Sequence, residues 1–252
     1  MKANHSPEAR THAVIDACTD CDVCRYLMPS ECLLFDDLYR LHDRAENGGT
    51  PISALDLRGL VDRCTYCGLC ACRDIRADII DAKTGFVARE GLPFGVRLMT
   101  RLEALVRIGG RLPRLTNAVS SNRALAGLMK RLVGVHAERA LPALPPASFP
   151  EWAHRVGIDR KPPVEASPKA AYFAGCTGRH LFPAVPRAVV EILQRFGVSV
   201  YYPEQHCCGM PTFAEGDRQQ TLSWVRRTID QLSALVDEGF AIVCSCPTCG
   251  YM

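Results

Sequence analysis

The stretch Cys64-Thr65-Tyr66-Cys67-Gly68-Leu69-Cys70-Ala71-Cys72 holds three thiols at CxxCxxC spacing, with a fourth two residues later. One irregular turn can direct three such side chains to a common centre, which is how a protein presents thiolates to the irons of a cubane cluster. A structural zinc site usually takes its cysteines in pairs from two knuckles, so a third cysteine at this spacing has no obvious use there.

A second run of the same spacing lies upstream, at Cys18-Thr19-Asp20-Cys21-Asp22-Val23-Cys24, and Cys32 follows it. Two such runs in one short domain are typical of two-cluster ferredoxins, so we predict two 4Fe–4S clusters in this part of the chain. The alternative is a pair of zinc knuckles in a metal-organised structural protein, and metal analysis separates the two.

The fourth ligand of each cluster departs from the usual CxxCxxCxxxCP run, whose last cysteine binds the other cluster of the pair. Met28, before Pro29, and Asp74 stand where that cysteine would be. We therefore predict that the displaced Cys32 and Cys72 replace it. A carboxylate from Asp74 is the other candidate, although it is a harder ligand than iron–sulfur sites usually take. The predicted sets are Cys18, Cys21 and Cys24 with Cys72, and Cys64, Cys67 and Cys70 with Cys32.

Composition favours a protein with reduced thiols. Fourteen cysteines in 252 residues are fewer than a disulfide scaffold carries. The N-terminus lacks the apolar region of a signal peptide, and no apolar run is long enough to span a bilayer. We expect a cytoplasmic protein, with peripheral attachment to the inner face of the membrane as an alternative.

Charge and periodicity divide the chain into three parts. Residues 1–85 carry ten basic and fourteen acidic side chains, and Leu34, Leu38 and Leu41 predict an amphipathic helix there. Ser53 could cap a second helix. Short helices between the two cysteine runs predict an α-helical ferredoxin domain over 1–85, after a polar lead at 1–17.

Residues 86–140 carry ten basic and only three acidic side chains, on two predicted amphipathic helices. One reading is a helical connector. The other is a basic surface that rests on anionic lipid or on a membrane partner. Aromatic residues for base stacking are few, so nucleic acid is the weakest candidate. Prolines between 142 and 163 indicate a linker, which gives a basic helical connector and Pro-rich linker over 86–168.

From Lys169 the pattern alternates between strand and helix, which predicts an α/β domain with a parallel sheet over 169–252 and an α+β chain overall. Each cysteine group follows the carboxyl end of a predicted strand, the edge at which open α/β sheets bind their ligands. Five thiols distant in sequence should therefore meet, whereas Cys244 lies inside a strand and is expected to fill the core. The five are Cys176, Cys207, Cys208, Cys246 and Cys249.

These five residues resemble the cysteine-rich CCG domain of heterodisulfide reductase subunits B and D. The match runs from Cys176 through thirty residues to Cys207-Cys208, then through thirty-seven residues, beginning with Gly209, to Cys246-Pro247-Thr248-Cys249. A helical ferredoxin domain followed by this module is similar to the iron–sulfur component of anaerobic glycerol-3-phosphate dehydrogenase. Iron–sulfur subunits of lactate and glycolate oxidation complexes share the layout. Family members usually carry two CCG repeats, so we expect a single, incomplete repeat here.

The resemblance implies an electron-transfer subunit, not a stand-alone enzyme, that passes electrons from a flavin-containing dehydrogenase partner toward quinone or another acceptor. It also allows a further iron–sulfur cluster in the CCG module and a membrane or quinone-linked partner. The main alternative is a thiol/disulfide reductase in its own right. No GxGxxG stands at a strand–helix turn, so we expect no bound flavin or nicotinamide nucleotide.

Overall fold

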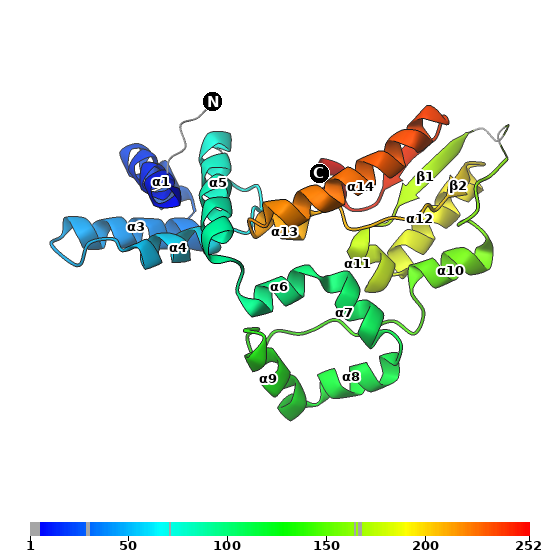
Figure 1. The fold of residues 1–252 in the computed structure, drawn as a ribbon, viewed down its shortest axis with the longest axis horizontal. Coiled ribbons are helices and arrows are strands. Elements are labelled where there is room, and N and C mark those ends of the chain that lie inside the picture. Colours follow the sequence, from blue (N-terminus) through cyan, green and yellow to red (C-terminus); the bar gives the residue numbers. More distant parts are fainter. Residues whose placement is uncertain (1–5, 29–30, 71, 164, 166–167) are drawn as a thin grey trace. The chain divides into compact units, whose positions relative to one another are not determined.

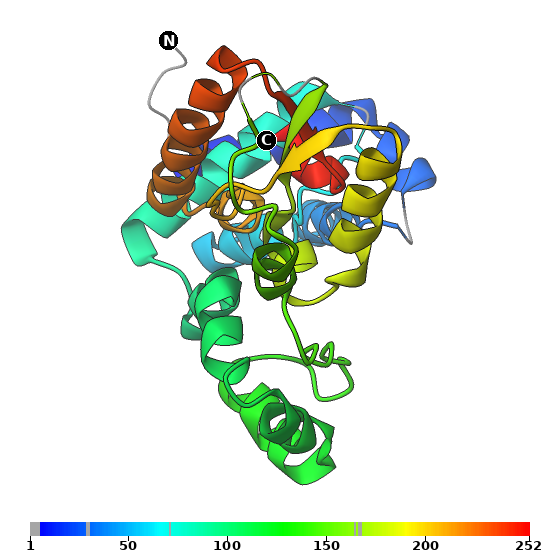
Figure 2. The same ribbon diagram turned by 90° about the vertical axis from the view of Figure 1, so that its right-hand side faces the viewer.

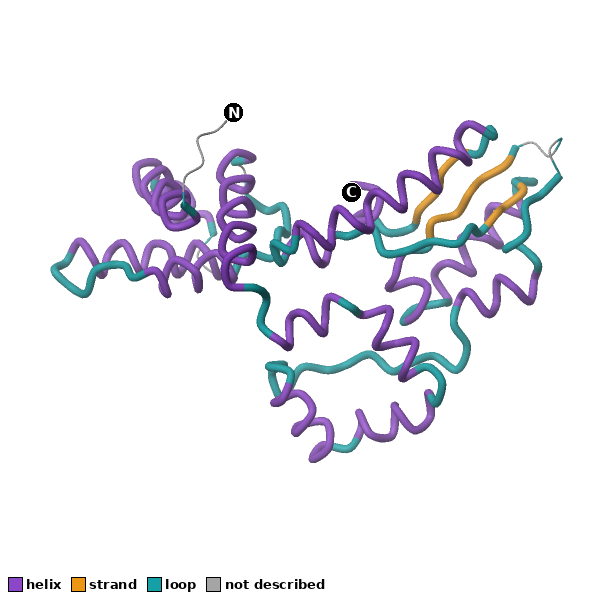
Figure 3. The backbone as a smooth tube through the Cα atoms, in the orientation of Figure 1, coloured by secondary structure: helices purple, strands orange, loops and turns teal. Residues whose placement is uncertain are grey.

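Helices make up the first part of the chain, and the described strands all follow residue 168 (Figures 1 and 3). The computed structural model describes residues 6–28, 31–70, 72–163, 165 and 168–252. They form two compact units. The helical unit consists of Met1–Leu92 with Pro211–Arg218, and the α/β unit of Pro93–Met210 with Gln219–Met252.

The helical unit contains five helices of the N-terminal region: α1 (Pro7–Cys21), α2 (Val23–Leu27), α3 (Leu33–Glu46), α4 (Ala54–Asp62) and α5 (Arg73–Glu90). The predicted helices correspond to α3 and to α4, which begins with a capping box between Ser53 and Asp56. The polar lead expected at 1–17 is wrong from Pro7 onward, where α1 begins, and residues 1–5 lie outside the described ones. Ser6 caps α1 and Pro7 occupies its first turn, a start well suited to a helix.

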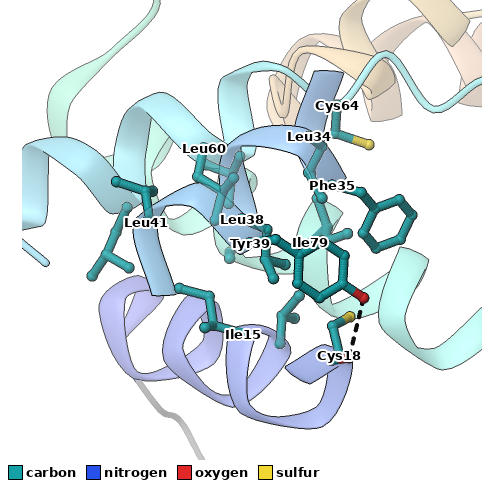
Figure 4. Packing of buried hydrophobic residues seen from close by; sticks show 14 of the residues in the cluster. Ile15, Cys18, Leu34, Phe35, Leu38, Tyr39, Leu41, Leu60, Cys64 and Ile79 are labelled. Carbon is teal, nitrogen blue, oxygen red and sulfur yellow. Dashed lines mark hydrogen bonds between the residues drawn. The ribbon is translucent and has the colours of Figure 1, made fainter. Parts of the chain in front are cut away.

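The core of the helical unit lies between α1, α3, α4 and α5. Ile15 of α1, Leu38 of α3, Leu60 of α4 and Phe86 of α5 are each almost fully buried. The same core includes the ligand candidates Cys18 and Cys64 (Figure 4). Apolar packing thus fixes the backbone from which both predicted cluster sites start.

A later part of the chain joins this unit. We define this part as the strap, residues 211–218, whose first half belongs to helix α13 (Met210–Ala214). The Phe213 ring meets the Tyr66 ring edge-on, with centroids 5.0 Å apart. Gly216 adopts φ of +77° against the backbone of Lys83 and Thr84, where a Cβ atom would come within 3.0 Å. A glycine is therefore required at the close approach.

Lys83 connects the strap to the second cysteine run. Its side chain is 1% exposed, and its Nζ lies 3.1 Å from a carboxylate oxygen of Glu215. The same Nζ donates to the backbone oxygen of Cys64, also at 3.1 Å. A buried ammonium needs such partners, because burying an unpaired charge is costly.

Four short helices form what we call the basic arm, residues 93–133: α6 (Phe94–Thr100), α7 (Leu102–Gly109), α8 (Pro113–Ser121) and α9 (Arg123–Leu132). Helix α7 ends at Gly109 with Gly110 as its C-cap, and Pro113 stands at the first helical position of α8. The side chains of Leu102 and Arg107 lie outside the described ones.

The α/β unit is built on a parallel sheet of β1 (Lys169–Phe173), β2 (Ser199–Tyr201) and β3 (Ala241–Cys244), in the order β2-β1-β3 (Figure 3). Ala170 of β1 pairs with Val200 on one side and with Ala241 on the other. The predicted fold class, helical first and then α/β with a parallel sheet, is confirmed.

Alternate residues of β1 pack on opposite faces of the sheet. Ala171 contacts the cluster of α14 (Arg218–Asp237), whereas Tyr172 contacts α12 (Ala184–Arg195) and α10 (Phe149–Val156) (Figures 1 and 2). This two-residue alternation is what a strand buried on both faces requires. Two short helices follow strands at the thiol edge, α11 (Gly175–His180) and α15 (Pro247–Tyr251).

The expectation of a linker in the Pro-rich stretch needs correction. The Pro-rich stretch contains α10, which starts with a capping box between Ser148 and Glu151 and buries Phe149 completely. In α12 the buried residues are Pro186 and Val190, whereas Ile192 and Phe196, which follows the last helical residue, are mostly exposed. Apolar residues occur on both sides of this helix, so periodicity alone does not identify the inner face.

Candidate functional site

The first cysteine run lies at a helix junction and not in one irregular turn. Cys18 and Cys21 belong to the last turns of α1, and Cys24 to α2. Asp22 between them adopts φ of +53°, a left-handed conformation that ends the first helix and redirects the chain. Tyr39 of α3 donates a hydrogen bond to the Cys18 carbonyl oxygen at 3.2 Å (Figure 4). The junction therefore has a fixed geometry.

A small cavity of about 40 Å³ is lined by five cysteines from the two runs. They are Cys18, Cys21, Cys24, Cys70 and Cys72. Cys72 precedes α5 and is thus close to the first run, although it follows the second in sequence. This is the neighbourhood in which Cys72 would complete the set of the first run.

Burial raises the pKa of the Cys18 thiol to about 12, and the nearby thiols of Cys24 and Cys72 add to the effect. Burial also raises the pKa of Cys24. Thiols that are buried together resist ionisation unless a cation compensates the thiolate charges. The chemistry of the site is thus consistent with an iron–sulfur group, whose ligands must be thiolates.

The second run is irregular, as expected. Tyr66 and Gly68 both adopt positive φ, and Arg76 of α5 lies over the Tyr66 ring at 5.4 Å. Burial raises the pKa of Cys64 and of Cys70, and in both cases the Cys32 thiol contributes. Cys32, immediately before α3, is therefore electrostatically close to the second run.

The two residues at the usual places of the fourth ligand have other surroundings. Met28 packs against the core of the helical unit, and Asp74 lies in the first turn of α5. Pro29 is outside the described residues. The pairing of Cys72 with the first run and of Cys32 with the second stays a prediction, which substitution of each cysteine can test.

Five thiols of the α/β unit meet at the carboxyl edge of the sheet. The Cys207 thiol donates to the Cys176 sulfur, and the two sulfurs are 3.6 Å apart. Cys208 forms hydrogen bonds with both Cys207 and Cys249, and Cys249 forms a further hydrogen bond with Cys246. Convergence of strand ends in a parallel sheet is the physical reason that residues 73 positions apart come together.

Hydrogen bonds among these thiols lower the pKa of the accepting sulfurs and raise the pKa of the donating ones. Bonds from Cys207 and then Cys249 hold the pKa of Cys208 below its ordinary range, and the bond from Cys207 likewise lowers that of Cys176. The pKa values of the donors Cys207 and Cys249 are raised for the same reason. The arrangement presents thiolate character at two sulfurs in one buried group, which is what a metal or cluster ligand requires.

Gln205 fixes the loop that carries Cys207, a role that its sequence position did not reveal. The side chain is nearly buried, accepts from Ala174 N at 2.8 Å and donates to Tyr172 O at 3.1 Å. Arg179 of α11 donates to the Gln205 carbonyl oxygen and pairs with Glu103 of the basic arm at 3.2 Å. The sequence signal for this support is weak: Gln205 stands two residues before Cys207, and Arg179 stands three residues after Cys176.

Gly175 allows the approach of Cys249. Its φ is +66°, and a Cβ atom there would lie 2.9 Å from the Cys249 sulfur. Both the backbone conformation and the space therefore require glycine.

Cys244 has surroundings that its place in a strand did not predict. It is half-buried and lines a groove of about 410 Å³ together with Cys208 and Cys249. The other walls are mainly apolar side chains of α14, including Ile229 and Val236, which are more than half exposed. Edge strand β3 leaves this side of α14 uncovered in the described part of the chain.

All fourteen cysteines are free thiols. Within the described residues, no three His, Cys, Asp or Glu side chains form a group suited to a single metal ion. Thiolates that bind different irons of one cluster need not converge on one atom. The thiol groups are thus consistent with iron–sulfur clusters.

The α/β unit has recognisable relatives. Residues 170–252 match the family model of the cysteine-rich domain named CCG. The resemblance deduced from the thiol spacing is therefore confirmed at the level of this domain. The matched residues contain β2, β3, all of β1 after Lys169, and the five converging cysteines.

Curated relatives share a shorter segment. Lactate utilization protein A of Exiguobacterium sp. is 38% identical over 64 residues, which are 25% of this chain and 26% of the relative. The protein of the same name from Bacillus pumilus is 39% identical over 62 residues, 24% of this chain and 26% of the relative. The chain thus matches about a quarter of the length of these relatives. No solved structure matches it.

Proposed function

We propose that this protein is an iron–sulfur electron-transfer subunit of an oxidoreductase complex. It relays electrons between a flavin-containing dehydrogenase partner and a quinone or another acceptor. The observation that supports this most is the gathering of free thiols at three places, two groups in the helical unit and one in the CCG domain, each with at least one buried member. Similarity to lactate utilization protein A supports lactate or a related 2-hydroxy acid as the substrate of the complex.

The proposal assigns two 4Fe–4S clusters to a ferredoxin domain over 1–85. One is held by Cys18, Cys21, Cys24 and Cys72, the other by Cys64, Cys67, Cys70 and Cys32. Residues 86–168 connect this domain to the CCG module at 169–252, where Cys176, Cys207, Cys208, Cys246 and Cys249 hold a further cluster.

When bound, such clusters accept and release single electrons. The chain's own part is to hold the thiolates, to exclude water and to orient the ligands. Cys18 and Cys64 are anchored in the apolar core, which limits water at the cluster edge. Gln205 and Arg179 orient the loop that carries Cys207. Hydrogen bonding and burial around sulfur are the levers by which a protein sets cluster potentials.

Anaerobic purification with iron, sulfide and zinc analysis tests the proposal. Two cubane clusters would give about eight irons and eight acid-labile sulfides per chain, with more if the CCG module is loaded. Electron paramagnetic resonance of the dithionite-reduced protein should show interacting clusters. Stoichiometric zinc without labile sulfide would overturn the proposal and favour the metal-organised structural protein.

A thiol/disulfide reductase is the second candidate function, favoured by the 3.6 Å approach of the Cys176 and Cys207 sulfurs. Reduction of a disulfide to two thiols takes two electrons and two protons, the electrons being supplied here by the reduced clusters. The pre-reduced chain would then be reoxidised by a small disulfide, and Cys176→Ser would abolish this reoxidation while leaving the clusters of the helical unit reducible. Reoxidation at the same rate in wild type and Cys176→Ser would eliminate this candidate.

A further inference from the structure

The basic arm exposes apolar side chains that a helix usually buries. On α9, Leu125, Leu128, Met129 and Leu132 recur at positions i, i+3, i+4 and i+7, which places them on one face. Leu128 is 59% exposed and Leu132 is 71% exposed. Ala126 is the one buried residue of α9, so the face that carries these four side chains is not used to pack the helix within the α/β unit.

The neighbouring helices continue the pattern. Ile108 at the end of α7, and Leu112 and Leu115 at the start of α8, are 60% to 70% exposed. Leu112 and Leu115 line an open groove of about 430 Å³ with Leu144. Helix α8 packs beside α9 (Figure 2). The arm therefore carries exposed leucines on consecutive helices, and not one isolated apolar residue.

Cationic side chains accompany these leucines. Residues 93–133 contain seven arginines and one lysine but a single carboxylate, Glu103. Glu103 pairs with the buried Arg179 of α11, so its charge is already compensated. Six of the arginines are exposed in the structure: Arg97, Arg101, Arg111, Arg114, Arg123 and Arg131. The solvent-facing charge of the arm is thus strongly positive.

We propose that the basic arm binds the surface of an anionic lipid bilayer. Helices that combine exposed Leu and Phe with Lys and Arg lie in the membrane interface, where the apolar face enters the acyl boundary and the cations meet lipid phosphates. Arginine can keep its guanidinium at the headgroups while its methylenes cover apolar surface. No described helix is both long and apolar enough to cross a membrane, so the interaction is at the surface.

Charge complementarity favours this occupant over a protein surface. The exposed arginines attract anionic groups, and the single carboxylate of the arm, Glu103, already pairs with Arg179 and is not offered to a partner's basic residues. An anionic bilayer supplies many phosphates and an apolar layer at once. The proposal is independent of what the thiols bind, and it can fail without affecting the electron-transfer proposal.

Vesicle flotation of the full-length chain tests the proposal. Wild type should float with vesicles of phosphatidylcholine and phosphatidylglycerol, should not float with pure phosphatidylcholine, and should be released by added NaCl. Leu128→Ser/Leu132→Ser should weaken the partition about tenfold, since two inserted side chains are lost. Arg123→Glu/Arg131→Glu should weaken it at least about tenfold, from about 1 kcal/mol per cation near the surface.

Two variants outside the arm serve as matched controls. Leu55→Ser removes an 82% exposed leucine of α4, and Arg195→Glu reverses an exposed arginine of α12. Both should float like wild type. Equal flotation with neutral vesicles, or arm variants that bind like these controls, would overturn the proposal. A third result would also overturn it: wild type is a dimer by light scattering and does not bind vesicles, whereas the leucine variant is a monomer. The arm would then contact a second copy of the chain. Circular dichroism checks that each variant folds.

Discussion

Replacing Lys83 by methionine should destabilise the helical unit strongly. The ammonium is 1% exposed and lies 3.1 Å from both the Glu215 carboxylate and the Cys64 carbonyl oxygen. Breaking a buried ion pair by removing one partner costs about 3–5 kcal/mol. Glu215 is 36% exposed, so its carboxylate can regain water and the cost falls. With about 1 kcal/mol for the lost hydrogen bond to Cys64, we expect about 3 kcal/mol in total.

Anaerobic urea unfolding, followed by far-UV circular dichroism and by cluster absorbance, measures this change. Glu215→Gln keeps an acceptor near the ammonium and should cost about 1–2 kcal/mol. The double variant should cost less than the sum of the two, since the residues interact directly. Lys161→Met is the matched control. Its ammonium pairs with Glu238 at 2.6 Å, but both side chains are about half exposed, so it should cost under about 1 kcal/mol. A Lys83→Met variant as stable as Lys161→Met would refute the reasoning.

Three further predictions concern the thiols and a helix cap. Cys72→Ser should lose the cluster of the first cysteine run and Cys32→Ser that of the second, each removing about four irons, and full iron content in both would contradict the ligand assignment. Gly175→Ala should disturb the CCG thiols, because a methyl group 2.9 Å from the Cys249 sulfur forces one of them to move. Loss of the CCG resonance with intact clusters in the helical unit is the expected spectrum, and an unchanged spectrum would show that the loop adapts. Asp56→Asn should cost about 1 kcal/mol at neutral pH. Hydrogen bonds from Ser53 lower the pKa of Asp56 to about 2, so the carboxylate stabilises the fold above its ordinary pKa near 4 and loses this effect as the pH falls toward 2. The difference in urea midpoint between wild type and variant should therefore shrink below pH 4 or so, and a constant difference would exclude the charge as its source.

Local pattern was sufficient where one element carries its own signal. The strand that becomes β1 is a short apolar run, and the cysteines after it had to lie at the carboxyl edge of the sheet. The capping box at Ser53 likewise identifies α4 from the sequence. Such features need no knowledge of distant residues.

Sequence reasoning failed where a distant partner decides the outcome. Helix α1 has few apolar residues, and only the facing core makes Val14 and Ile15 significant. Helix α10 is short and lies among prolines, yet Phe149 is buried by the rings of Tyr172 and Tyr202. In the sequence Lys83 resembles a surface lysine, and only the contact with residue 215 shows that it is buried. The burial of each of these residues depends on contacts that no local window contains.

The strap also imposes an order on synthesis. Residues 211–218 pack in the helical unit, but the chain makes them only after β1 and β2, so the ribosome must release most of the α/β unit before the helical unit can be completed. N-terminal domains usually fold first as they emerge. Here the emerging N-terminal helices would have to wait for about 120 more residues at about 5–20 residues per second, with the Lys83 ammonium lacking its carboxylate. A cluster inserted before that point would bind to an incomplete helical unit. The order of the residues in the chain therefore delays cluster insertion until the strap has been synthesised.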